Sequence, residues 1–161
     1  MNGTAALKIT TPTDREIAMT RVFDSPRRLL FDALTKPKLL KQWLLGPPGW
    51  TMPVCEIDLK VGGSYRYLLR DAAGTEMGIS GIYREILAPE RLVVTEKFDE
   101  SWYPGEALIT TTLVEQNGKT TLTLTVRYES REARDIALKS PMEQGVSANY
   151  NRLAELLATT S

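Results

Sequence analysis

Histidine is absent from the 161 residues of the chain, and Cys55 is the only cysteine. Without an imidazole, neither a Ser-His-Asp nor a Cys-His nucleophilic site can be assembled, and zinc sites built on histidine are excluded with them. A single cysteine cannot form an intrachain disulfide, which is typical of proteins that stay in the cytoplasm. We therefore expect a cytoplasmic protein that holds no metal and no cofactor.

An excess of charge of either sign is missing too, because 20 Lys and Arg residues balance 20 Asp and Glu residues. A protein that neutralises phosphates needs a surplus of positive charge, so nucleic acid is not an expected partner. No run of ~20 apolar residues is present, so we expect no insertion into a membrane, and the N-terminus lacks the apolar segment of a secretory signal. With 42% hydrophobic and 25% charged residues, the composition is that of an ordinary globular protein.

The spacing of apolar residues changes along the chain. Residues 16–23 are predicted to form a first strand, and Pro26 and Pro37 each open a short helix, because the fixed φ of proline suits a first turn. From residue 54 to residue 128 apolar residues recur with a period of two, which predicts further strands. A last helix of roughly 18 residues is predicted from one apolar stripe at helical spacing, made by Met142, Val146, Asn149, Leu153, Leu156 and Leu157.

Short motifs mark the ends of several elements. Asn117-Gly118 lies between two alternating runs and predicts a tight hairpin, because both residues tolerate positive φ. Residues 55–61 alternate between apolar and polar side chains, which predicts one continuous strand. Ser140 and Glu143 have the spacing of a capping box at the start of the last helix.

Together these elements predict an α+β protein with a flexible N-terminal arm at 1–14 and a single domain at 15–159. The domain has a curved antiparallel sheet of six to seven strands wrapped around the long C-terminal helix, with two short helices after the first strand. A sheet of this width twists strongly, so one long helix cannot fill its concave face. This geometry favours a cavity between sheet and helix.

Three segments resemble a known family. They read WLLGPPGW at 43–50, EIDLKVGGSYRY at 56–67 and GIYREILAPERLV at 81–93. With the terminal helix, they make residues 15–158 similar to the START-like helix-grip (SRPBCC) superfamily, and more narrowly to its branch related to the activator of the heat-shock-protein-90 ATPase. The resemblance implies the helix-grip fold with a pocket between sheet and long helix. It implies no catalytic motif, because the superfamily holds lipid carriers, hormone receptors and polyketide cyclases alike.

Large side chains on the expected inner faces are the candidate lining of this pocket. Trp43 and Trp50 flank a proline-glycine loop beside the expected pocket mouth. The other candidates lie on one face of the strands or on one stripe of the last helix, and they are Tyr65, Tyr67, Tyr83, Met142, Val146 and Tyr150. Ordinary core packing is the alternative interpretation for each aromatic residue.

Two carboxylates are the candidate catalytic groups. Glu96 lies between two apolar residues on a face that could point inward, and Glu85 is similarly placed with Tyr83. Burial there would raise the pKa of a carboxyl group, which suits a general acid or base. In the alternative, each carboxylate points outward and pairs with an arginine on a strand, namely Arg66, Arg70 or Arg84.

The first functional hypothesis is binding of a small hydrophobic or aromatic molecule in the cavity, without catalysis. The alternative is a cyclase or hydrolase that uses Tyr and Glu side chains in the same cavity. A second alternative, implied by the resemblance, is a chaperone-associated module for protein interaction. Whether the protein is an enzyme stays open, although the missing histidine favours binding alone. A homodimer is compatible with the sequence, but no feature specifies its surface.

Overall fold

The computed structural model describes residues 6–159 of the chain. The strands in this part are β1 (Lys8–Thr10), β2 (Glu16–Phe23), β3 (Thr51–Ile57), β4 (Ser64–Arg70), β5 (Glu76–Leu87), β6 (Arg91–Phe98), β7 (Ala107–Gln116) and β8 (Lys119–Arg127). The helices are α1 (Arg27–Thr35), α2 (Pro37–Trp43), α3 (Arg131–Lys139) and α4 (Met142–Ala158). The α+β class is confirmed, with one strand more than the six to seven expected.

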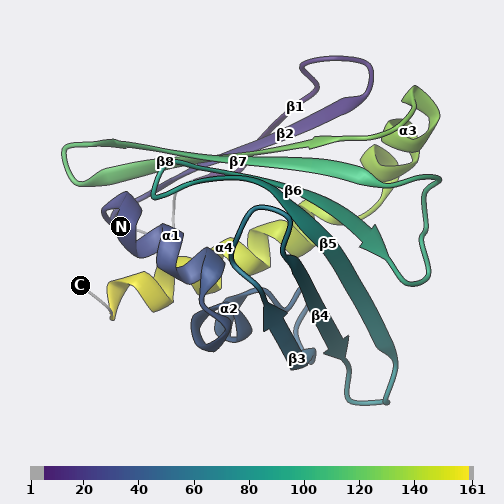
Figure 1. The fold of residues 1–161 in the computed structure, drawn as a ribbon, viewed down its shortest axis with the longest axis horizontal. Helices are drawn as coiled ribbons and strands as arrows, with labels where there is room; N and C mark the ends of the chain where they lie inside the picture. The colour runs from purple at the N-terminus through teal and green to yellow at the C-terminus, as the bar shows by residue number, and fades with distance from the viewer. Residues whose placement is uncertain (1–5, 160–161) are drawn as a thin grey trace.

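The eight strands of the described residues form one antiparallel sheet in the order β1-β2-β8-β7-β6-β5-β4-β3. Because β2 pairs with β8, helices α1 and α2 carry the chain from one side of the sheet to β3 at the opposite edge. In Figure 1, β2, β7 and β8 lie across the upper part of the molecule, β3, β4 and β5 are steeply inclined below them, and α4 lies inside the curve. The expected helix-grip fold is therefore confirmed.

The sheet bends where β4, β5 and β6 meet at Gly81. Gly81 lies opposite Tyr65 of β4. The Tyr65 hydroxyl reaches past it and donates a hydrogen bond to the carbonyl oxygen of Thr95 on β6 at 2.6 Å. A Cβ at residue 81 would overlap both that oxygen and the Tyr65 ring. Glycine is therefore required here, because it lets a side chain of one strand cross the backbone of the next.

A β-bulge farther along β5 changes which residues point inward. Tyr83 pairs with Val94, whereas Glu85 pairs with Val93, so Arg84 is an extra residue on this strand. One extra residue shifts the two-residue alternation of side chains to the opposite face. Tyr83 is buried, and after the bulge Ile86 is the partly buried residue while Glu85 is exposed.

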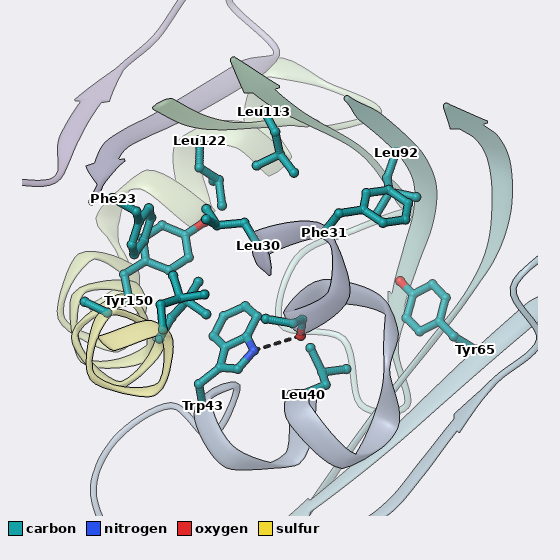
Figure 2. Packing of buried hydrophobic residues seen from close by; sticks show 14 of the residues in the cluster. Phe23, Leu30, Phe31, Leu40, Trp43, Tyr65, Leu92, Leu113, Leu122 and Tyr150 are labelled. Carbon is teal, nitrogen blue, oxygen red and sulfur yellow. Dashed lines mark hydrogen bonds between the residues drawn. The ribbon is translucent and has the colours of Figure 1, made fainter. Parts of the chain in front are cut away.

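The main core lies between the concave face of the sheet and helices α1, α2 and α4 (Figure 2). The Trp43 indole nitrogen donates a hydrogen bond to the Ala33 carbonyl oxygen at 2.9 Å, which joins α2 to α1. The Trp43 ring packs against Tyr150 of α4, with ring centroids 6.2 Å apart. Tyr150 in turn meets Phe23 of β2 edge-on, with centroids 5.6 Å apart. Aromatic contacts thus fix all three helices against the sheet.

The N-terminal segment is partly built into the sheet. Lys8–Thr10, which were expected within a flexible arm, form β1 and pair with residues 18–20 of β2. The backbone groups of β2 at this edge find partners in β1, which a sequence search for long alternating runs does not detect. Residues 1–5 of the expected arm lie outside the described residues.

The strand expected at 55–61 ends earlier, at Ile57. The chain then turns, with the Gly63 N–H donating to the Lys60 carbonyl oxygen. Leu59 and Val61 therefore lie exposed in the turn, although they continue the alternation of the strand. The chain therefore leaves the strand to form this turn, although its side chains still alternate between apolar and polar residues.

Two further predictions concerned the ends of elements: the hairpin at Asn117-Gly118 is confirmed, and the capping box at Ser140 and Glu143 is wrong. Asn117 and Gly118 have φ values of 54° and 78° and join β7 to β8. Ser140, by contrast, ends α3 by donating its hydroxyl to the Ala137 carbonyl oxygen, and α4 starts after Pro141 without a side-chain cap. Only two residues separate the helices, so Ser140 serves the first of them. No helix between residues 6 and 159 has the length and apolar character needed to cross a membrane.

Two glycine substitutions test the bend and the fit of α4. Gly81→Ala is expected to lower the free energy of unfolding by about 1–3 kcal/mol, because the new methyl group overlaps backbone and ring atoms. Gly145→Ala in α4 is expected to raise the free energy of unfolding by up to about 1 kcal/mol. A Cβ added at residue 145 meets no atom within 4 Å, and alanine has a higher helix propensity than glycine. Urea denaturation of both variants measures these changes. Equal effects at the two positions would contradict the description of the bend.

Candidate functional site

Two adjoining hollows, called here the two lobes of the cavity, lie between the concave face of the sheet and α4 and share part of their lining. Their volumes are about 170 Å³ and about 330 Å³. Both lobes are lined by side chains from α2's end, the sheet and α4, and the shared lining residues are Leu44, Tyr67, Glu96, Ile109, Leu124, Val146 and Asn149. We expected a cavity because one long helix cannot fill the concave face of a wide sheet. The cavity is present, and α4 covers only part of that face.

The walls of both lobes are mainly apolar and aromatic. The first lobe lies toward α1 and α2 and is also lined by Leu34, Leu40, Trp43, Tyr65, Tyr83, Leu92, Val94, Thr111 and Tyr150. The second lies toward the other end of the sheet and is also lined by Met19, Gly46, Leu69, Met77, Ile79, Phe98, Trp102, Tyr103, Val126, Tyr128, Met142 and Gly145. Neither set contains a lysine or an arginine. Such walls favour an apolar or aromatic ligand.

Glu96 is the only charged side chain in either set of lining residues. It belongs to the inward face of β6, where the alternation places it with Val94 and Phe98. Its backbone lies opposite Ala107 of β7, a small residue. The Glu96 carboxylate therefore stands at the junction of the two lobes.

The surroundings of the Glu96 carboxylate oppose its ionisation. Among residues 6–159, no side chain or backbone group forms a hydrogen bond or an ion pair with it. Burial raises the pKa of this carboxyl to about 7, because a charged carboxylate loses its hydration in an apolar cavity. Near neutral pH, Glu96 thus exchanges between a charged form and a neutral form.

Four tyrosines lie near Glu96, namely Tyr65, Tyr67, Tyr103 and Tyr128. Burial and the nearby Glu96 carboxylate raise the pKa of each phenol above its ordinary value, so all four stay neutral at physiological pH. The Tyr103 hydroxyl is buried and has no hydrogen-bond partner in the described part of the chain. The Tyr65 hydroxyl is already bound to Thr95, as described for the bend.

A polar cluster joins α4 to the loop after α2 at the wall of the cavity. The Asn149 side-chain oxygen accepts hydrogen bonds from the backbone N–H groups of Leu45 and Gly46, at 3.0 and 2.7 Å. Arg152 donates to the same oxygen at 3.1 Å and to the Gly46 carbonyl oxygen at 2.7 Å. These bonds fix the position of α4 through directional contacts, so the helix is held without apolar packing along its whole length.

Most of the expected lining residues come together in the cavity. Trp43, Tyr65, Tyr83 and Tyr150 line the first lobe and Met142 lines the second, while Tyr67 and Val146 line both. Trp50 lines neither lobe. The chain turns at Gly46 and Gly49, which both have positive φ, and Trp50 is left half-buried just before β3.

The two candidate carboxylates have opposite positions. Glu96 points into the cavity, contrary to the outward alternative. Glu85 points to solvent, as in the outward alternative, but its ion-pair partner is Arg91 at 3.1 Å and not one of the three arginines considered for it. The bulge at Arg84 is the cause of this outward position, because it breaks the alternation between Tyr83 and Glu85.

The aromatic wall of the second lobe was not recognised from the sequence. Phe98, Trp102, Tyr103 and Tyr128 form a chain of edge-on ring contacts there, with centroids 5.0 to 6.1 Å apart. Tyr128 follows β8 and continues the alternation of its inward residues Leu122, Leu124 and Val126, which is a usable signal. Trp102 and Tyr103 lie in a loop, where no periodicity indicates the direction of a side chain.

The segment that builds this cavity matches a known family. Residues 24–158 match the family model described as Activator of Hsp90 ATPase homolog 1-like protein. No curated protein matches the sequence.

Solved structures of bacterial proteins share the fold. A protein from Rhodobacter sphaeroides is 31% identical and superposes with a TM-score of 0.90, covering 95% of this chain and 98% of its own. A protein from Staphylococcus epidermidis is 26% identical with a TM-score of 0.80, covering 97% and 95%. A protein from Nitrosomonas europaea, 24% identical with a TM-score of 0.81 and coverage of 92% and 97%, supports the fold alone. The resemblance noted in the sequence is confirmed.

Substitution of the cavity carboxylate tests its environment. In the unfolded chain Glu96 has an ordinary pKa, so its raised pKa of about 7 in the folded protein makes stability fall as pH rises through that value. Glu96→Gln removes this titration. Between pH 5.5 and 8.5 we expect the variant to gain about 2 kcal/mol of unfolding free energy relative to the original protein.

Glu85→Gln is the matched control, because Glu85 is exposed and paired with Arg91. Denaturation of all three proteins at both pH values gives the comparison. A pH-independent difference for Glu96→Gln, or an equal change for Glu85→Gln, would contradict the assignment of Glu96 to the cavity.

Proposed function

The chain belongs to the family of Activator of Hsp90 ATPase homolog 1-like proteins, and from its cavity we propose that it binds a small hydrophobic or aromatic molecule between the sheet and α4. The observation that carries this proposal is the two-lobed cavity with apolar and aromatic walls. A helix-grip domain is a ligand-binding architecture in general, and the identity of the ligand is the finer step proposed here.

The energetics of such binding follow from the walls. A ligand that buries about 250 Å² of apolar surface gains roughly 6 kcal/mol before the cost of association is subtracted. Affinity in the micromolar range therefore needs further contributions from ring contacts and from the few polar groups of the cavity. The rings of Tyr65, Tyr67 and Tyr83 supply such contacts in the first lobe, since they already pack together with centroids 4.9 and 5.7 Å apart.

Acid–base catalysis in the same cavity is a second candidate function, and Glu96 is the observation that favours it. A carboxyl group with a pKa of about 7 is suited to take and return a proton near neutral pH. This function requires that a bound ligand be converted to product by the original protein and not by Glu96→Gln. Mass spectrometry of a co-purified ligand after incubation with each protein distinguishes catalysis from binding alone.

Filling the cavity tests the proposed binding. Val146 of α4 lines both lobes, so Val146→Trp is expected to occupy the ligand's space. The probe is N-phenyl-1-naphthylamine, a neutral aromatic dye that fluoresces in apolar surroundings. We expect the original protein to bind it and Val146→Trp to bind it at least about tenfold more weakly, a loss that corresponds to roughly 1.4 kcal/mol.

Val114→Trp is the matched control, because Val114 is 56% exposed and lines neither lobe. Circular dichroism checks that both variants fold. Binding of the dye that is unchanged by Val146→Trp, or absent from the folded original protein, would refute the proposed function.

A further inference from the structure

We propose that the molecule bound in this cavity carries a positively charged amino group, which pairs with Glu96 while its apolar part packs among the aromatic walls. This inference rests on the proposed function and names the chemical class of its ligand. It excludes fatty acids and other carboxylates from the expected ligands.

The position of Glu96 is the first argument. Its carboxylate faces both lobes, so a ligand that fills either one lies beside it. Among residues 6–159, the carboxylate has no hydrogen-bond or ion-pair partner of its own. A buried charge without a partner is costly, and a cationic ligand supplies the missing partner.

The charge of the walls is the second argument. No lysine or arginine lines either lobe, so a negatively charged ligand meets no compensating cation and is repelled by Glu96. The oxygen of Asn149, another polar side chain that faces both lobes, is already bound to Leu45, Gly46 and Arg152. Glu96 is therefore the strongest available acceptor for an ammonium group in the cavity.

The aromatic rings are the third argument. Ammonium groups are attracted to the faces of aromatic rings, and this attraction strengthens where water is excluded. Tyrosine rings from β4, from the loop after β6 and from the residue after β8 lie near enough to the Glu96 carboxylate to interact with its charge, namely Tyr65, Tyr67, Tyr103 and Tyr128. A carboxylate enclosed by neutral rings is a combination suited to an organic cation.

The pH dependence follows from the groups that face the cavity. Burial raises the pKa of each titratable tyrosine among them, so Glu96 alone changes its charge between pH 5.5 and 8. These tyrosines lie on β4, β5 and α4, in the loop after β6 and directly after β8, and they are Tyr65, Tyr67, Tyr83, Tyr103, Tyr128 and Tyr150. A cation binds the ionised form of Glu96, so its affinity rises with pH until Glu96 is fully ionised.

Three probes with the same ring system test the proposal. They are 2-naphthylmethylamine, 2-naphthalenemethanol and 2-naphthoic acid, which are a cation, a neutral molecule and an anion at pH 7.5. Isothermal titration calorimetry with the full chain is expected to give the amine about 10- to 100-fold tighter binding than the alcohol, as for a charge-assisted hydrogen bond. The acid is expected to bind most weakly.

Two variants and a pH series identify the responsible group. Glu96→Gln is expected to remove the preference for the amine while leaving the affinity for the alcohol within about threefold, whereas Glu85→Gln keeps the preference, since that side chain is paired with Arg91 at the surface. From pH 5.5 to 7.5 the affinity of the original protein for the amine is expected to rise about 20- to 30-fold, and that for the alcohol is not.

Each other result overturns the inference. If the alcohol or the acid binds as tightly as the amine, the ligand is not a cation, and binding of the neutral dye shows separately that the proposed function stands. An amine preference that survives Glu96→Gln shows that another group holds the cation. If the dye binds and none of the three probes does, the ligand class is wrong. If neither dye nor probes bind, the proposed function itself fails.

Discussion

The crossing of Tyr65 over Gly81 is the contact on which the shape of the molecule depends. Because residue 81 has no side chain, the Tyr65 hydroxyl can pass it and bind the backbone of Thr95 two strands away. The sheet is curved, and strands β2, β7 and β8 run in a different direction from β3, β4 and β5 (Figure 1). A flat sheet would pack along the whole of α4, whereas a bent one contacts it at the ends of its curve and encloses a hollow.

The hollow also needs a helix that does not collapse into it. Asn149 and Arg152 hold α4 to the backbone of the loop after α2 by three hydrogen bonds, and Arg152 also donates to the Asn149 oxygen within the helix. Ring contacts of Tyr150 with Trp43 and Phe23 also hold α4 in place. Directional polar bonds and large rings set the distance between helix and sheet, so apolar contact between them is not the only force that positions α4. The cavity is thus a consequence of the polar and aromatic contacts that keep α4 apart from the sheet.

The fold could be predicted from the sequence because its signals are repeated over long segments. Alternation over many residues, proline at two helix starts and Asn117-Gly118 at a hairpin each depend on local conformation, and they agree with the structure except where the alternation continues past the end of β3. The position of Glu85 could not be predicted from the alternation, because the extra residue Arg84 moves the side chains after it to the opposite face of the strand. Trp102 and Tyr103 lie in a loop that has no period, so their place in the second lobe depends on tertiary contacts alone.

Glu96 shows where local rules and the structure disagree. An apolar residue in its place would complete the inward face of β6 between Val94 and Phe98 and would carry no cost of desolvation. The fold therefore does not require a carboxylate there, and ionisation of Glu96 near neutral pH costs stability because burial opposes its charged form. A residue that weakens the fold, faces two lobes of one cavity and has no partner among the described residues is best explained by what enters the cavity. The same cavity without Glu96 would still bind apolar molecules, but it would not select among them by charge.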